Sequence, residues 1–372
     1  SSQMEETELP PDPLRLEELT AASLSQWVYT ATVGERGCDQ RGQLPQLPFV
    51  SLQAHCVLED VKLGSLRVAT ATAQLPGGRK VFFVVFKGTS YLLDVVNWNV
   101  EHDYKETGDP ASFVHKGAAG MVRNLLFLKV ESELAFLQQL QAAFNAGVRR
   151  LVLAGHSLGG LYATAMLLAA FKQQQGLGPE VPPGIQQLLD SVRCVTFGAP
   201  MCFGSDLGSK QTPEFLRFEA FVRERAVNFI HEGDPCPRAW SAVDPRDLMS
   251  KAADALKRGI KVERGRVKGK IAGRVVDMAI QGVLARPDFD RQIVGCSRDF
   301  RHLSRIRLLS QQNKPCLHWR RDFCLTKRGF EDHAVAKYLE RLLEASNSER
   351  PSCQIYDDDE LGSKITLLHL VS

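Results

Sequence analysis

The chain has 372 residues, of which 44% are hydrophobic and 24% charged, as in a folded globular protein with a sizeable core. This composition excludes disorder, collagen and a coiled coil as descriptions of the whole chain. The formal net charge of +3 at pH 7 lacks the basic excess of a nucleic-acid-binding protein, so any basic partner surface has to be local.

The cysteines and the first residues of the chain indicate the cellular compartment of the protein. The nine cysteines are odd in number and include no C-x-x-C pair, which predicts neither a zinc ribbon nor a complete disulfide framework. The acidic start, residues 1–6, lacks the basic and apolar regions of a signal peptide. A signal peptide cleaved from upstream of residue 1 is the alternative. We expect a cytoplasmic protein, with a peripheral membrane or organellar location as alternatives.

The first third of the chain is predicted to form a helix and then strands. A helix is expected over residues 14–28, within an N-terminal segment 1–45, and strands dominate from there to Phe86. The run Lys80–Phe86 is apolar on both faces, which is typical of a central strand.

Strands and helices then alternate. Further runs that are apolar on both faces cover residues 151–154, 192–197 and 226–230, and helical patterns lie between the strands at residues 125–146 and 161–172. The sequence therefore predicts an α/β fold with a mostly parallel central sheet and helices on both faces.

One segment departs from this alternation through its charge. Residues 251–274 carry nine basic and two acidic side chains, a net charge of +7, while the rest of the chain is at −4. They fall within residues 241–296, which we expect to be an insertion in the main domain, 46–345. We expect a C-terminal tail to follow this domain, at residues 346–372. A helical insertion is indicated by the spacing of Val267, Ile271, Val275 and Met278.

The sequence from Gly155 to Gly159, G-H-S-L-G, fits the G-x-S-x-G motif, which places a serine on a sharp turn between a strand and a helix. A side chain at either glycine is expected to clash with neighbouring backbone. The helix start behind Ser157 offers N–H groups to an anion. The pattern predicts that Ser157 is a nucleophile. The alternative is a serine without a catalytic role on a glycine-rich turn.

A serine hydroxyl is a poor nucleophile until a base removes its proton, and in this fold the chain order is serine, acid, histidine. His333 is the favoured base, because it lies where an amphipathic helix begins and a helix N-terminus keeps an imidazole neutral. The other histidines after Ser157 are also candidates: His231, His302, His318 and His369.

The acid is expected just beyond a strand of the sheet, where residues 226–230 are followed by Asp234. Pro235 holds Asp234 in an extended conformation, away from the helical region. Glu232 and Asp244 are rival acids.

A tetrahedral oxyanion needs hydrogen-bond donors. The N–H of Leu158 is one by its position behind the serine. The other is expected from the turn after Phe86, where Thr89 offers its backbone N–H and its hydroxyl.

These residues make the chain resemble the class 3 lipases, the Rhizomucor-type α/β-hydrolases. Seven short motifs follow the family's order over residues 80–345: 86–89 (FKGT), 114–117 (VHKG), 155–160 (GHSLGG), 195–200 (VTFGAP), 234–238 (DPCPR), 301–303 (RHL) and 332–333 (DH). The resemblance implies an α/β-hydrolase fold with a catalytic triad of Ser157, Asp234 and His333, and oxyanion donors at Thr89 and Leu158. Nothing in the sequence indicates a metal or an organic cofactor.

The resemblance also implies a function, a serine carboxylic-ester hydrolase that acts on lipid acyl esters through an acyl-enzyme. The residues do not distinguish between a triacylglycerol lipase, a diacylglycerol lipase and a phospholipase A1. The alternative from another class is a lipase-like, catalytically silent interaction or signalling protein. Residues 90–98 correspond to the family's lid, with an ordinary packed helix as the alternative. The basic residues 251–274 are expected either to dock on an anionic membrane surface or to be a solvated insertion.

Overall fold

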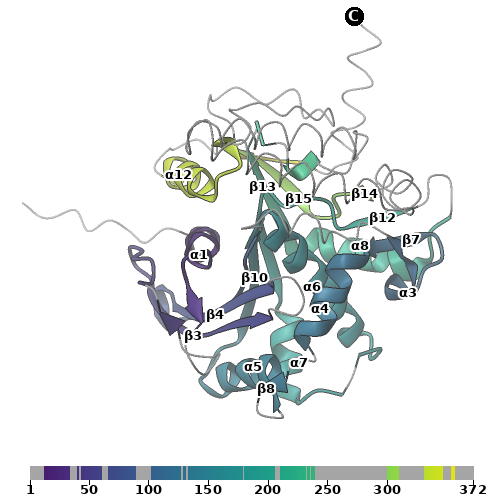
Figure 1. The fold of residues 1–372 in the computed structure, drawn as a ribbon, viewed down its shortest axis with the longest axis horizontal. Helices are drawn as coiled ribbons and strands as arrows, with labels where there is room; N and C mark the ends of the chain where they lie inside the picture. Colours follow the sequence, from purple (N-terminus) through teal and green to yellow (C-terminus); the bar gives the residue numbers. More distant parts are fainter. Residues whose placement is uncertain are drawn as a thin grey trace, which may run out of the picture.

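The computed structural model of the chain (Figure 1) describes residues 12–33, 40–41, 43–60, 66–88, 102–126, 129–130, 133–178, 180–205, 210–231, 233–234, 236–238, 300–309, 331–346 and 353–356. The expected insertion at 241–296, the expected lid at 90–98 and Thr89 lie outside these residues.

An eight-stranded sheet forms the centre of the molecule, in the strand order β16-β15-β13-β11-β10-β5-β4-β3. These strands are β3 (Ser51–Asp60), β4 (Leu66–Gln74), β5 (Lys80–Phe86), β10 (Arg150–His156), β11 (Arg193–Phe197), β13 (Ala226–His231), β15 (Arg305–Leu309) and β16 (Cys353–Tyr356). The strands from β15 to β5 are parallel to one another, whereas β16, β4 and β3 pair antiparallel at the edges. The prediction of a mostly parallel sheet is confirmed.

Helices cover both faces of the sheet (Figure 1). The described helices are α1 (Pro13–Trp27), α3 (Tyr104–Thr107), α4 (Lys116–Leu126), α5 (Ala135–Asn145), α6 (Leu158–Gln174), α7 (Pro183–Asp190), α8 (Pro213–Arg225) and α12 (Val335–Ser346), with 3₁₀ turns η2 (Pro76–Gly78) and η3 (Cys236–Arg238). Helices α1 and α12 lie on one side, and α4 and α6 on the other.

The central strands are buried on both faces because each face has its own apolar core. In β5, Phe82 and Val84 belong to the core that α6 covers, while Phe83 and Val85 belong to the core that α1 covers. This explains why residues 80–86 are apolar without alternation. The apolar runs at 151–154, 192–197 and 226–230 are likewise strands, β10, β11 and β13.

A second, smaller sheet has four strands in the order β14-β12-β7-β6. They are β6 (His102–Asp103), β7 (Ser112–His115), β12 (Phe203–Ser205) and β14 (Phe300–Arg301). Two further hairpins pair β1 (Thr32–Val33) with β2 (Gln40–Arg41) and β8 (Lys129–Val130) with β9 (Glu133–Leu134).

The single helix predicted over residues 125–146 is wrong. Helix α4 ends at Leu126, and the β8–β9 hairpin intervenes before α5 begins at Ala135. In α5 the buried residues recur at helical spacing, as Phe136, Leu140 and Ala143. The apolar run 125–130 has no such period, so only the second half of the predicted segment carried a helical signal.

The expected C-terminal tail, 346–372, contains one described strand. Its residues 353–356 form β16, which pairs antiparallel with β15 at the edge of the central sheet. The β-prone residues Ile355 and Tyr356 favour a strand here, and β15 offers a free edge to pair with.

The most apolar stretch, 151–171, runs through β10 and into α6, as expected of a strand and helix. Among the residues that the structure describes, no helix has the length and apolar character needed to cross a bilayer.

Candidate active site

Ser157 occupies the turn between β10 and α6. Its φ of 57° and ψ of −129° lie in a region that non-glycine residues rarely adopt. The backbone N–H of Ser157 donates to the carbonyl oxygen of Phe197 over 2.9 Å, which ties the turn to β11. The predicted strand–turn–helix around the serine is confirmed.

The glycines on either side of Ser157 let three backbone segments meet. A Cβ atom on Gly155 would lie 2.4 Å from the carbonyl carbon of Gly159, and one on Gly159 would lie 2.1 Å from the carbonyl oxygen of Phe86. Both distances are too short for non-bonded atoms. The expected clash with neighbouring backbone is therefore confirmed at both positions.

Asp234 and His333 form an ion-pairing contact. Nδ1 of His333 lies 2.8 Å from Oδ2 and 3.0 Å from Oδ1 of Asp234, whose side chain is fully buried. Burial raises the pKa of Asp234, but the charge and hydrogen bond of His333 and further hydrogen bonds outweigh it, and the net pKa is lowered. An ionised Asp234 accepts a hydrogen bond from Nδ1–H, which leaves Nε2 of His333 as the basic nitrogen.

Two more donors hold the Asp234 carboxylate. The hydroxyl of Tyr338, in α12, donates to Oδ2 over 2.5 Å, and the N–H of Cys236 donates to Oδ1 over 2.8 Å. Gly198 packs against the same carboxylate with a φ of +58°, and a Cβ atom there would lie 2.4 Å from Oδ2. The loop after β11 therefore needs glycine at this position.

His156, the residue before the serine, links α1 to the segment that carries His333. Its Nε2 lies 2.6 Å from the carbonyl oxygen of His333, and its Nδ1 lies 3.0 Å from the hydroxyl of Tyr29. Burial, and secondarily the charge of His333, lowers the pKa of His156 to about 3. The ring is thus neutral, and since a carbonyl only accepts, Nε2–H donates to His333 while Nδ1 accepts from Tyr29.

The hydroxyl of Ser157 contacts a thiol in this conformation. Its Oγ lies 3.7 Å from Sγ of Cys236, and among the described residues it has no hydrogen bond to His333. The His333 ring packs against the residue before the serine, with its centroid 4.6 Å from that of the His156 ring. Burial raises the pKa of the Cys236 thiol, which therefore stays neutral.

The other predicted site residues are placed as follows. His302 bonds through Nε2 to the carbonyl oxygen of Pro237 over 2.9 Å, and Nδ1 of His231 lies 3.5 Å from Asp332. Leu158 is the first residue of α6, where N–H groups have no partner within the helix. The remaining candidates lie outside the described residues: His318, His369, Glu232, Asp244 and Thr89.

Sequence reasoning missed the supporting residues of the site. Tyr338 lies in the amphipathic helix that follows His333, and its hydroxyl binds Asp234. A buried tyrosine needs a hydrogen-bond partner, and this one follows the predicted base by a little over one helical turn, so a signal was present. Tyr29 and Cys236 carry no comparable signal, because their place beside the site comes from the fold.

No cluster of three histidine, cysteine, aspartate or glutamate side chains within the described part of the chain has the arrangement of a metal site.

Residues 83–243 match the family profile described as lipase (class 3). No curated protein matches the chain.

Solved structures similar to this chain include lipases from Rhizomucor and Rhizopus. The propeptide complex of Rhizomucor miehei lipase has 16% identity and a TM-score of 0.37, covering 64% of this chain and 72% of its own. Lipase II from Rhizopus niveus has 17% identity and a TM-score of 0.39, with 62% and 76% covered. A lipase from Rhizopus microsporus var. chinensis has 14% identity and a TM-score of 0.38, with 62% and 70% covered.

Proposed function

We propose that this chain, whose residues 83–243 match the lipase (class 3) family profile, hydrolyses acyl esters of lipids with Ser157 as its nucleophile. The match supports the assignment of the chain as a carboxylic ester hydrolase. The observation that supports the residue assignment best is the contact between the buried Asp234 and His333, which lies beside the strained turn at Ser157.

In the proposed mechanism, Nε2 of His333 removes the proton of Ser157 as Oγ attacks the ester carbonyl carbon. Asp234 holds the imidazole in the required tautomer and stabilises the imidazolium. The N–H of Leu158 and a donor from Thr89 bind the oxyanion. His333 then protonates the leaving alcohol, and water repeats the steps on the acyl-enzyme to release the carboxylic acid.

The mechanism requires a rotation of the Ser157 side chain. Its hydroxyl has to turn from Cys236 toward Nε2 of His333, and catalytic hydrogen bonds commonly tighten only when substrate is bound. The neutral Cys236 thiol is a weak hydrogen-bond partner, so the contact opposes this rotation only slightly.

The substrate class is a lipid ester of the kind that triacylglycerol lipases, diacylglycerol lipases or phospholipases A1 cleave. We further propose that the basic residues 251–274 bring an anionic membrane surface to this site. The insertion that contains them starts shortly after Arg238, and η3 (Cys236–Arg238) carries the thiol that contacts Ser157.

Hydrolysis of p-nitrophenyl esters by purified Ser157→Ala protein tests the assignment. We expect the variant to lose activity by about 10³-fold or more. Ser51→Ala makes the same change at an exposed position of β3 and should retain full activity. Product analysis on mixed lipid vesicles then identifies the ester. Full activity of Ser157→Ala would refute the assignment, and an inactive parent protein would favour a silent, lipase-like interaction protein.

A further inference from the structure

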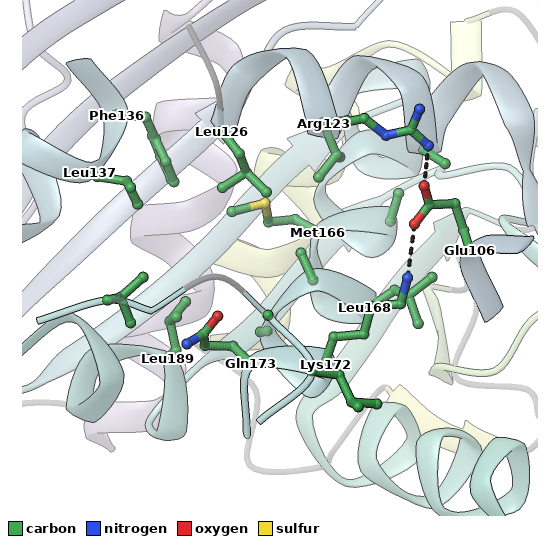
Figure 2. Close-up of a pocket in the computed structure, with 18 of the residues that line it drawn as sticks. Glu106, Arg123, Leu126, Phe136, Leu137, Met166, Leu168, Lys172, Gln173 and Leu189 are labelled. Carbon is green, nitrogen blue, oxygen red and sulfur yellow. Dashed lines mark hydrogen bonds and ion pairs between the residues drawn. The ribbon is translucent and has the colours of Figure 1, made fainter. Parts of the chain in front are cut away.

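A cavity of about 310 Å³ lies among the helices on one face of the sheet. Figure 2 shows its walls, which come from α4, α5, α6 and α7 and are apolar over most of their area. The apolar lining includes Val122, Leu126, Phe136, Leu140, Met166 and Leu189. Its size is at the lower end of the range for small-molecule sites, about 300–1,000 Å³.

The cavity is separate from the candidate active site. Ser157, Asp234, Cys236 and His333 are not among its lining residues. On α6 the lining begins at Ala165 and ends at Gln173, and with a rise of about 1.5 Å per residue Lys172 stands about 22 Å along the helix from Ser157. A molecule anchored at Lys172 therefore has its head far from the nucleophile.

One end of the cavity is ionic. Glu106 accepts a hydrogen bond from Lys172 over 2.9 Å and another from Arg123, and Figure 2 shows this cluster at the side away from Phe136 and Leu137. Burial raises the pKa of Glu106, but the two cations outweigh it and the net pKa is lowered. Glu106 is therefore ionised, and two positive charges face one negative charge at this end.

The cations keep hydrogen-bonding capacity and contact with water. Arg123 is 52% exposed and Lys172 28% exposed, and each uses one donor for Glu106. An arginine has five N–H donors and a lysine three, so a second carboxylate can bind beside Glu106. Glu180, the other acid of the lining, is exposed and belongs to the segment between α6 and α7.

We propose that this cavity binds a medium- or long-chain fatty acid, with its carboxylate at Arg123 and Lys172 and its aliphatic chain among α4, α5 and α6. The apolar walls match the chain, and the remaining N–H donors of Arg123 and Lys172 match the head. Each buried methylene raises the affinity about fourfold, so the aliphatic chain of the fatty acid contributes most of the binding free energy. The site takes the class of acid that ester hydrolysis releases, but it does not depend on catalysis at Ser157.

Calorimetric titration of the Ser157→Ala protein tests the proposal, because this variant separates binding from turnover. We expect decanoate to bind more tightly than decanol, which has the same chain and no charge. Between octanoate and decanoate the affinity should rise about 15-fold. Equal binding of decanol and decanoate would overturn the carboxylate site.

Variants locate the ligand. Lys172→Ala should weaken the binding of decanoate about tenfold and leave the binding of decanol unchanged. Lys210→Ala, which removes an exposed loop lysine, should change the affinity for neither ligand. Ala169→Phe should block both ligands by filling the cavity, and Leu137→Trp does so from the opposite wall if the first variant misfolds. Ala220→Phe, on the exposed side of α8, is the matched control. Unchanged decanoate binding in folded Ala169→Phe or Leu137→Trp would place the ligand elsewhere and refute the proposal.

Discussion

The carboxylate of Asp234 receives hydrogen bonds from a ring, a hydroxyl and a backbone N–H, which belong to His333, Tyr338 and Cys236. Each of these donors favours the ionised form, whereas burial favours the protonated form. The proposed mechanism needs the ionised form, because a protonated Asp234 cannot stabilise an imidazolium. We therefore propose that the Tyr338 hydroxyl is a positioning group for the base.

Tyr338→Phe tests this role. We expect kcat/KM to fall, and the acid limb of its pH profile to move to higher pH, because loss of the hydroxyl raises the pKa of Asp234. The free energy of unfolding should fall by about 1.5–3 kcal/mol, as for a hydrogen bond to a charged group. Tyr29→Phe makes the same change beside His156 and should leave the acid limb in place. An unmoved acid limb in Tyr338→Phe would contradict the role.

His156 makes a separate prediction about pH and stability. Its pKa falls from 6.5 to about 3 on folding, so between these values the unfolded chain binds a proton that the native protein excludes. Stability is thus lost as the pH decreases through this window, by up to about 1.4 kcal/mol per pH unit. Urea denaturation at pH 7 and pH 5 should show a smaller loss in His156→Gln than in the parent chain. Equal losses in both proteins would argue against a neutral, buried His156.

At the scale of elements, the close approach of β5, β10 and α6 depends on Gly159. Gly159→Ala should destabilise the protein by about 3 kcal/mol or prevent folding, because its Cβ would meet the carbonyl oxygen of Phe86 at 2.1 Å. Gly120→Ala, in α4, meets nothing within 4 Å and should be neutral or stabilise by up to about 1 kcal/mol. Thermal unfolding compares the two variants. Similar melting temperatures would mean that the turn tolerates a side chain.

Helix α1 is held to the sheet by a buried ionic cluster. Glu17 is fully buried and pairs with Arg79, Arg150 and Arg193, and Glu18 pairs with Arg193 and Arg307. Buried charges are costly when they lose their partners, so the cluster fixes the position of α1 and, through it, of Tyr29.

We expect Glu17→Ala to lower the free energy of unfolding by about 3–5 kcal/mol, because it leaves arginines without their acid. Glu340→Ala removes an exposed acid that pairs with Lys337 in α12 and should leave the stability almost unchanged. Chemical denaturation measures both changes. A loss of under 1 kcal/mol in Glu17→Ala would show that water replaces the cluster.

At the scale of the whole molecule, the sequence predicted the parts of the fold that have a local signal. Residues 80–86 and 151–157 could be identified as strands and a turn because burial on both faces and glycine spacing are local properties. The contacts of Tyr29 and Cys236 with site residues could not, because they join segments up to 127 residues apart through the sheet topology. The edge strand β16 was missed for the same reason, since its partner β15 lies far away in sequence.

The proposed membrane surface belongs to this scale as well, because the net charge of +7 in residues 251–274 contrasts with the rest of the chain. Each cation near an anionic surface contributes about 1 kcal/mol. Sedimentation with phosphatidylserine-containing vesicles should lose most of the bound protein when residues 245–290 are deleted or the salt concentration is raised. Unchanged binding after the deletion would exclude this segment as the docking element.

The most direct measurement of the central claim is the site of covalent labelling by a fluorophosphonate, which reacts with an activated serine. Mass spectrometry of the labelled and digested protein should find the adduct on Ser157, and His333→Ala should abolish it while the protein stays folded. An adduct on another serine, or undiminished labelling of Ser157 in His333→Ala, would contradict the account.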